Sequence, residues 1–168
     1  MKMTRLFSKI LVIGIGNADR GDDGLGPHVA AELAGRLPRE VSLLTRRGDM
    51  LALMDDWAGF DAVVCVDAAE PAGQPGRVCR VDLMHESLPR DVSLTSSHAF
   101  GLVEAVALAR TLGRAPKEMI VVAVEAASFE PGATMTEAVF AAAKPACDLV
   151  VTEIARLCVQ PEEAVTHA

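Results

Sequence analysis

A continuous apolar run, Ile10 to Ile15, followed at once by a glycine-rich and acidic loop, constrains this chain more than any other feature. An unbroken apolar run of this length is typical of a strand buried on both faces of a parallel sheet. Gly14 and Gly16 at its end are typical of a turn that receives a phosphate at a helix N-terminus. The third glycine of that fingerprint is missing, however, because Asp19 stands in its place.

The loop after this strand favours a cation over a phosphate. It carries Asp19, Asp22 and Asp23, and only Arg20 opposes their charge. Three carboxylates at a helix entrance repel an anionic ligand and attract a positive one. The loop is therefore interpreted as facing a metal, while a metal- or nucleotide-binding module without catalysis stays open as the alternative.

Strand-like and helix-like segments alternate along the rest of the chain. Strands are expected at 41–45, 61–67, 77–82 and 118–125, and helices at 28–36, 50–57, 98–111 and from the capping box Thr134-x-x-Glu137 to Leu157. Pro145 predicts a kink or break in the last helix. Strand 77–82 follows too short a loop for a helical crossover, so an antiparallel direction is expected for it.

This alternation predicts one domain over 1–168, with a frayed tail from about residue 160. The expected fold is a three-layer α/β/α sandwich around a mainly parallel five-stranded twisted sheet, of the phosphorylase/hydrolase-like kind. The net charge of −7 and an aromatic content of 4% argue against nucleic acid and anionic membrane surfaces as partners. The cysteines form no CxxC pair and no zinc-like spacing, which favours a reducing, cytoplasmic setting.

Three polar residues map to the carboxyl edge of the predicted sheet, where ligands bind in open α/β folds. Asp23 follows the first strand, Asp67 ends strand 61–67, and His98 closes the segment Thr95-Ser-Ser-His. If the first and third strands are neighbours, two carboxylates and an imidazole converge, a set that suits Ni, Zn, Fe or Mn. Simpler interpretations also exist, because such residues often cap helices or shape turns. No Gly-x-Ser-x-Gly elbow supports a serine hydrolase.

These motifs, in this order, resemble the hydrogenase maturation proteases. The resemblance rests on Gly14-Ile-Gly-Asn-x-x-x-x-Asp-Asp-Gly-Leu-Gly, Val63-Val-Cys-Val-Asp-Ala, Ser96-Ser-His and Val124-Glu-Ala-Ala-Ser-Phe-Glu-Pro-Gly. It implies an endopeptidase that removes the C-terminal extension from the precursor of a nickel–iron hydrogenase large subunit after nickel insertion. It also implies that Asp23, Asp67 and His98 bind a metal and carry the catalytic function.

The resemblance leaves two mechanisms open. Either the three residues hold a divalent metal of the resting enzyme that activates water, or they inspect nickel carried by the substrate, which is the preferred hypothesis. The general base is not identified, and Asp22 is a candidate only by location. One segment departs from the family, because Arg46-Arg47-Gly48-Asp49 replaces an Asp-Gly-Gly-Thr-like loop. Either Arg46 and Arg47 dock an acidic surface, or they are simply solvated.

Overall fold

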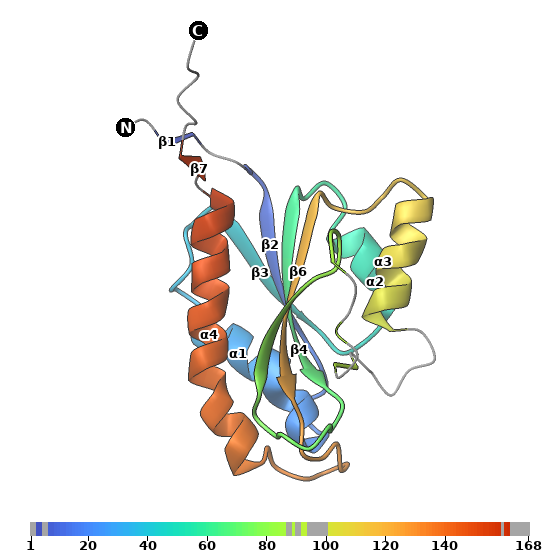
Figure 1. The fold of residues 1–168 in the computed structure, drawn as a ribbon, viewed down its shortest axis with the longest axis vertical. Coiled ribbons are helices and arrows are strands. Elements are labelled where there is room, and N and C mark those ends of the chain that lie inside the picture. The colour runs from blue at the N-terminus through green and yellow to red at the C-terminus, as the bar shows by residue number, and fades with distance from the viewer. Residues whose placement is uncertain are drawn as a thin grey trace, which may run out of the picture.

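A five-stranded sheet forms the centre of the computed structural model, which describes residues 3–4, 7–86, 89, 92–93, 101–158 and 160–161. The strands are β2 (Ile10–Ile15), β3 (Val41–Arg46), β4 (Ala62–Ala69), β5 (Val78–Asp82) and β6 (Glu118–Glu125). Their order across the sheet is β3-β2-β4-β6-β5, and only β5 runs antiparallel to its neighbour. A separate antiparallel pair, β1 (Met3–Thr4) with β7 (Gln160–Pro161), joins the two ends of the described chain (Figure 1).

Helices cover both faces of the sheet, as the alternating pattern predicts. On one face lie α1 (Leu25–Leu33) and the long α4 (Glu137–Cys158), and on the other lie α2 (Met50–Asp56) and α3 (Leu102–Thr111) (Figure 1). Alternate strand residues supply the two cores, so that Val12 packs on the α1/α4 side and Ile13 on the α2/α3 side. The three-layer α/β/α prediction is confirmed. Among the described helices, none has the length and apolar character needed to cross a membrane.

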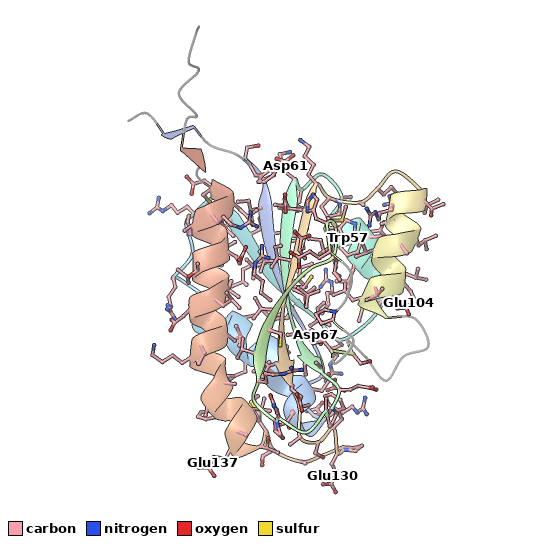
Figure 2. The ribbon with its side chains drawn as sticks, in the orientation of Figure 1. Trp57, Asp61, Asp67, Glu104, Glu130 and Glu137 are labelled. Atoms are coloured by element: carbon pink, nitrogen blue, oxygen red, sulfur yellow. The ribbon has the colours of Figure 1, made fainter. Side chains whose placement is uncertain are left out.

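The strand that carries Asp67 is longer than predicted. All eight residues of β4 are buried, and the strand continues two residues past Asp67 because Ala68 and Ala69 still pair with β6. Figure 2 shows Asp61 and Asp67 toward opposite ends of this strand. The antiparallel direction of β5 is confirmed. Because β5 pairs with β6 and not with β4, it is the outermost strand on its side of the sheet.

Two helix boundaries differ from the sequence-based expectation. A short 3₁₀ helix, η1 (Gly21–Gly24), leads directly into α1, which therefore begins at Leu25 rather than at residue 28. Pro27 then lies in the first turn, where a missing N–H costs no helical hydrogen bond. The last helix begins at Glu137, so Thr134 does not cap it, and α4 passes through Pro145 without a break.

Candidate functional site

Close backbone contacts bring the acidic η1 helix onto the end of β2. A side chain at Gly14 would collide with the carbonyl of Gly26, and one at Gly16 would collide with the backbone of Asp23. Gly16 also has a φ of 142°, which side-chain-bearing residues rarely adopt. The two glycines that suggest a phosphate loop therefore allow η1, and with it Asp23, to pack closely against the carboxyl edge of the sheet.

Asp67 and Asp23 interact electrostatically at this edge. Asp67 lies on β4, and Asp23 lies on η1, beyond the end of β2, which pairs with β4 in parallel with Gly14 opposite Val66. The Asp23 Oδ2 atom accepts the N–H of Asn17 at 2.9 Å, which fixes this half-buried carboxylate. The predicted convergence of the two carboxylates is supported by their electrostatic interaction, because the charge of Asp23 acts directly on the pKa of Asp67.

The environment of Asp67 is strongly unfavourable for an isolated carboxylate. The residue is 3% exposed, and among the described residues its Oδ2 atom has no hydrogen-bond partner. Burial, and then repulsion from Asp23, raises the pKa of Asp67 well above its usual value, while the N–H of Ala68 offsets part of this effect. A cation placed between the two carboxylates would remove both penalties, so the donor set and its burial fit a divalent metal.

Asp22 has a different role from its neighbour. It is 0% exposed, and its Oδ2 atom accepts the N–H groups of Ala127 at 2.7 Å and Ser128 at 3.1 Å. Its Oδ1 atom accepts the N–H of Thr136 at 2.7 Å and the hydroxyl of Thr136 at 2.9 Å. With both oxygens occupied, Asp22 fastens η1 to the β6–α4 loop. The candidate assignment of Asp22 as general base does not fit these contacts.

The three carboxylates of the loop therefore do not act together, contrary to the expectation from sequence. Asp19 is exposed and forms an ion pair with Arg47 at 2.8 Å. Arg46 is held by Asp56 through two contacts of 2.6 Å. Both arginines are thus paired within the chain.

His98 lies outside the described residues, and so do Ser96 and Ser97. The chain just before them is placed, because the N–H of Glu70 donates to the carbonyl oxygen of Ser93 at 2.9 Å. Glu70 directly follows β4. Ser93, which precedes His98 in the sequence, is therefore hydrogen-bonded to Glu70, the third residue after Asp67.

Two polar clusters were not anticipated from the sequence. Asp82, His85 and Glu118 bring their ligand atoms within 4.8 Å of one another at the opposite edge of the sheet. There the Asp82 carboxylate accepts the N–H groups of Met84 and His85, which explains the cluster as a capped turn. The second cluster, Arg77 with buried Glu125, lies at the same edge as Asp67. In the sequence, the only indication of this second cluster was a glutamate inside the expected strand 118–125.

Comparisons with known proteins identify the family. The profile of the family described as hydrogenase maturation protease matches residues 27–153. The hydrogenase 2 maturation protease of Escherichia coli (strain K12) is 29% identical over 163 residues, covering 94% of this chain and 98% of that protein.

Solved structures show the same fold. The hydrogenase maturating endopeptidase HybD from E. coli has a TM-score of 0.74 at 25% identity, covering 90% of this chain and 95% of that one. The NiFe hydrogenase maturation protease HybD from Thermococcus kodakarensis has a TM-score of 0.67 at 22% identity, with 87% and 99% covered. Because the family profile spans most of the chain, including Asp67 and the β6–α4 loop, this protein belongs to the hydrogenase maturation protease family and is an endopeptidase.

Proposed function

We propose that this endopeptidase removes the C-terminal extension from a nickel–iron hydrogenase large-subunit precursor once nickel is in place. One observation carries the proposal: two carboxylates interact electrostatically at the carboxyl edge of the sheet, and one of them is buried with an oxygen that accepts no hydrogen bond within the described chain. Such a pair is costly unless a cation joins it. The names of the relatives support the hydrogenase as the process served.

The proposed ligands are Asp23, Asp67 and His98. Asp23 comes from η1 and Asp67 from β4, and His98 follows in the sequence after Ser93, whose carbonyl oxygen accepts the N–H of Glu70. Two carboxylates and one imidazole are a mixed oxygen and nitrogen set that suits nickel and leaves coordination positions open. In this proposal the precursor fills those positions, so nickel enters as part of the substrate and the site inspects it before cleavage.

Other residues position the proposed ligands and control their surroundings. Asp22 fastens η1 to the β6–α4 loop, and the Asn17 N–H donates to the Asp23 carboxylate and fixes it. A metal bound there would polarise the scissile carbonyl group. The burial of Asp67 keeps water away from its carboxylate and strengthens its attraction for a cation. We place the reaction in the cytoplasm, because all four cysteines are free thiols in the structure.

Processing of a nickel-loaded precursor, followed by gel mobility, tests the proposal. Asp23→Asn, Asp67→Asn and His98→Ala should each abolish cleavage while circular dichroism shows a folded protein. Asp19→Asn is the matched control, because this carboxylate lies in the same loop but is exposed and pairs with Arg47 on the surface. Normal cleavage by all three site variants would refute the assignment.

A binding measurement separates the protease from the alternative of a nucleotide-binding module. Ni²⁺ or Cd²⁺ should raise the melting temperature of the wild-type protein, and His98→Ala should remove that increase. Added nucleotide should leave the melting temperature unchanged. Stabilisation by nucleotide without stabilisation by metal would contradict the proposed site.

A further inference from the structure

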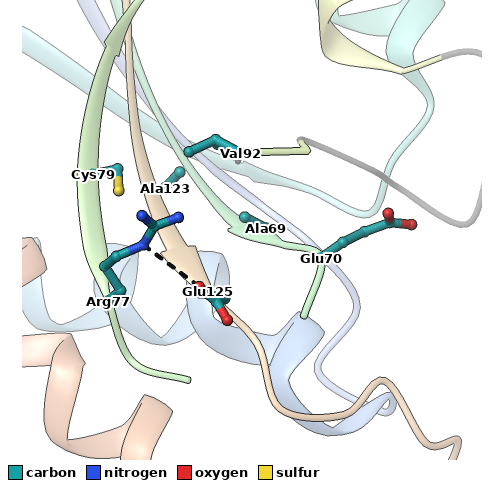
Figure 3. A pocket seen from close by; sticks show the side chains of 7 residues that line it. All are labelled: Ala69, Glu70, Arg77, Cys79, Val92, Ala123 and Glu125. Atoms are coloured by element: carbon teal, nitrogen blue, oxygen red, sulfur yellow. Dashed lines mark ion pairs between the residues drawn. The ribbon is translucent and has the colours of Figure 1, made fainter. Parts of the chain in front are cut away.

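The two sides of the candidate metal site differ in how open they are. On the side of β6 and β5, the sheet is covered by packed side chains, because Ala69, Val92 and Ala123 are at most 5% exposed. Arg77 pairs with Glu125 beside them (Figure 3). An extended peptide is therefore better accommodated on the side of the other outermost strand, β3 (Figure 1), where the last two residues are exposed.

The outer edge of β3 carries main-chain groups that face away from the sheet. Along a strand, the N–H and C=O groups of successive residues point alternately to its two sides. Because the Gly16 N–H donates to the Arg46 carbonyl oxygen at 2.9 Å, Arg46 faces β2. Leu44 shares that direction, whereas Leu43 and Thr45 face outward.

Within the described residues, three of these outward groups have no hydrogen-bond partner. The Thr45 carbonyl oxygen accepts a hydrogen bond from the Arg46 guanidinium at 3.2 Å, which leaves the Thr45 N–H and both main-chain groups of Leu43. β3 pairs with β2 over 6 residues without a bulge, and it contains no proline. Bulges and prolines are common protections of edge strands against pairing, so the β3 edge is open to an added strand.

A pocket adjoins the carboxyl end of this edge. Its volume is about 400 Å³, and it is lined by Gly16, Ala18, Pro27 and residues 45–47. Gly16 connects the pocket to the candidate site, because it packs so closely on the Asp23 backbone that a side chain would collide there. A peptide that follows the β3 edge can therefore place a side chain in the pocket, next to the residue that contacts a proposed metal ligand.

The spacing of the sheet fixes where on the substrate this contact falls. A strand added to β3 would lie two strand spacings, or about 10 Å, from β2, which leads into η1 and Asp23. An extended peptide advances about 3.3 Å per residue, so about three residues cover this distance. A segment on the β3 edge would therefore begin about three residues from the group bound at the metal site.

We propose that the C-terminal extension of the precursor adds to the outer edge of β3 as an extra strand, with one side chain in the adjoining pocket. Main-chain hydrogen bonds to Leu43 and Thr45 supply affinity, and the pocket sets the register. The inference rests on the proposed function: the metal site takes the nickel-bearing part of the precursor, which leaves the edge for the extension. Arg46 and Arg47 keep their ion pairs in this arrangement, because the peptide binds main-chain groups.

Steady-state cleavage of the nickel-loaded precursor by Thr45→Pro and Thr45→Ala tests this contact. Both variants lack the hydroxyl, but only proline removes the outward N–H, and proline is tolerated where the N–H of an edge strand faces solvent. KM should be about tenfold higher for Thr45→Pro than for Thr45→Ala, with kcat values within about twofold of each other. Equal KM values for the two variants would overturn the proposal.

Hydrogen exchange keeps the test decisive if proline disturbs folding. A saturating synthetic peptide with the sequence of the extension should slow the exchange of the Leu43 and Thr45 N–H groups about tenfold in the wild-type protein. The N–H groups of Leu44 and Arg46 are the internal control, because β2 already protects them and their exchange rates should stay the same. Unchanged exchange at Leu43 and Thr45 would count against an added strand.

Proline substitutions along the extension test the same contact from the substrate. Because only alternate residues of an added strand direct their N–H groups toward β3, KM should rise at every second position, beginning about three residues from the scissile bond. An equal effect at all positions, or none, would contradict strand addition.

The results distinguish failure of this contact from failure of the proposed function. If wild type cleaves, Asp67→Asn does not, and Thr45→Pro has the KM of Thr45→Ala, the edge contact is refuted and the metal site stands. If Asp67→Asn cleaves normally, the proposed function fails, and the inference fails with it. If sedimentation shows a dimer that Thr45→Pro converts to a monomer, the edge pairs with a second copy of this chain, and the proposal is refuted.

Discussion

Replacing Asp22 by asparagine should destabilise the protein far more than its conservative chemistry suggests. The Asp22 Oδ2 atom accepts from the N–H groups of Ala127 and Ser128, and Oδ1 accepts from the N–H of Thr136. The Thr136 hydroxyl lies within hydrogen-bond distance of both oxygens. An asparagine keeps one acceptor oxygen and turns an NH₂ group toward the other donors. At least two bonds to a charged acceptor are lost, and the side chain is 0% exposed, so water cannot replace them.

The expected magnitude follows from these contacts. A hydrogen bond to a charged group contributes about 1.5–3 kcal/mol, so the loss of two predicts a decrease of about 3–6 kcal/mol in the free energy of unfolding. For a chain of this size, this corresponds to a decrease of roughly 6–24 °C in the melting temperature. Thr136, just before α4, donates to Asp22 through its N–H and its hydroxyl, so weaker bonds there should loosen the start of α4 as well.

Urea denaturation followed by tryptophan fluorescence measures this effect, because Trp57 is the only tryptophan and is 1% exposed. Asp19→Asn, in the same loop but exposed, should change the free energy of unfolding by no more than about 0.5 kcal/mol. An Asp22→Asn protein within 1 kcal/mol of wild type would show that the β6–α4 loop is not held through Asp22.

Further predictions concern other buried groups. Burial alone would raise the pKa of Glu153, but hydrogen bonds from Arg80 and Arg156 outweigh burial and lower it. The resulting stability is present above the unfolded-state pKa of about 4.3 and is lost as the pH falls through the lower folded-state pKa. Glu153→Gln should therefore cost about 2–4 kcal/mol at pH 7, and urea titrations should show the difference shrinking below pH 4. Cys65→Ala should lower the melting temperature while cleavage of the precursor continues, because Cys65 is 0% exposed and lies behind the site in the core. Gly26→Ala should prevent soluble expression or strongly reduce thermal stability, because its Cβ would collide with the backbone of Ile15.

Local sequence patterns were sufficient for the strands and for the edge at which the site forms. The apolar run before Gly16 and the run 118–125 each match a strand of the structure, because full burial leaves an uninterrupted apolar pattern. Asp23 and Asp67 could be assigned to one edge, because parallel neighbouring strands end on the same side. These features depend on short stretches of chain.

Features that depend on distant partners could not be predicted in this way. Nothing near Asp22 indicates that its partners are Ala127, Ser128 and Thr136, more than a hundred residues later. The same contact explains why the capping motif at Thr134 was misleading, since Thr136 next to the helix start is committed to Asp22. Nor does the sequence reveal that Glu125 and Arg77 meet across two antiparallel strands.

The hydrogen bonds between Asp22 and the β6–α4 loop also affect when the site can assemble during translation. Asp23 is next in the chain to a residue whose hydrogen-bond donors include Thr136, so an emerging polypeptide without that region lacks the bonds that fasten η1 to the β6–α4 loop. A ribosome must therefore release most of the chain before these bonds can form. The protease becomes competent late in its own production, and a truncated product that stops before the β6–α4 loop should be inert rather than promiscuous.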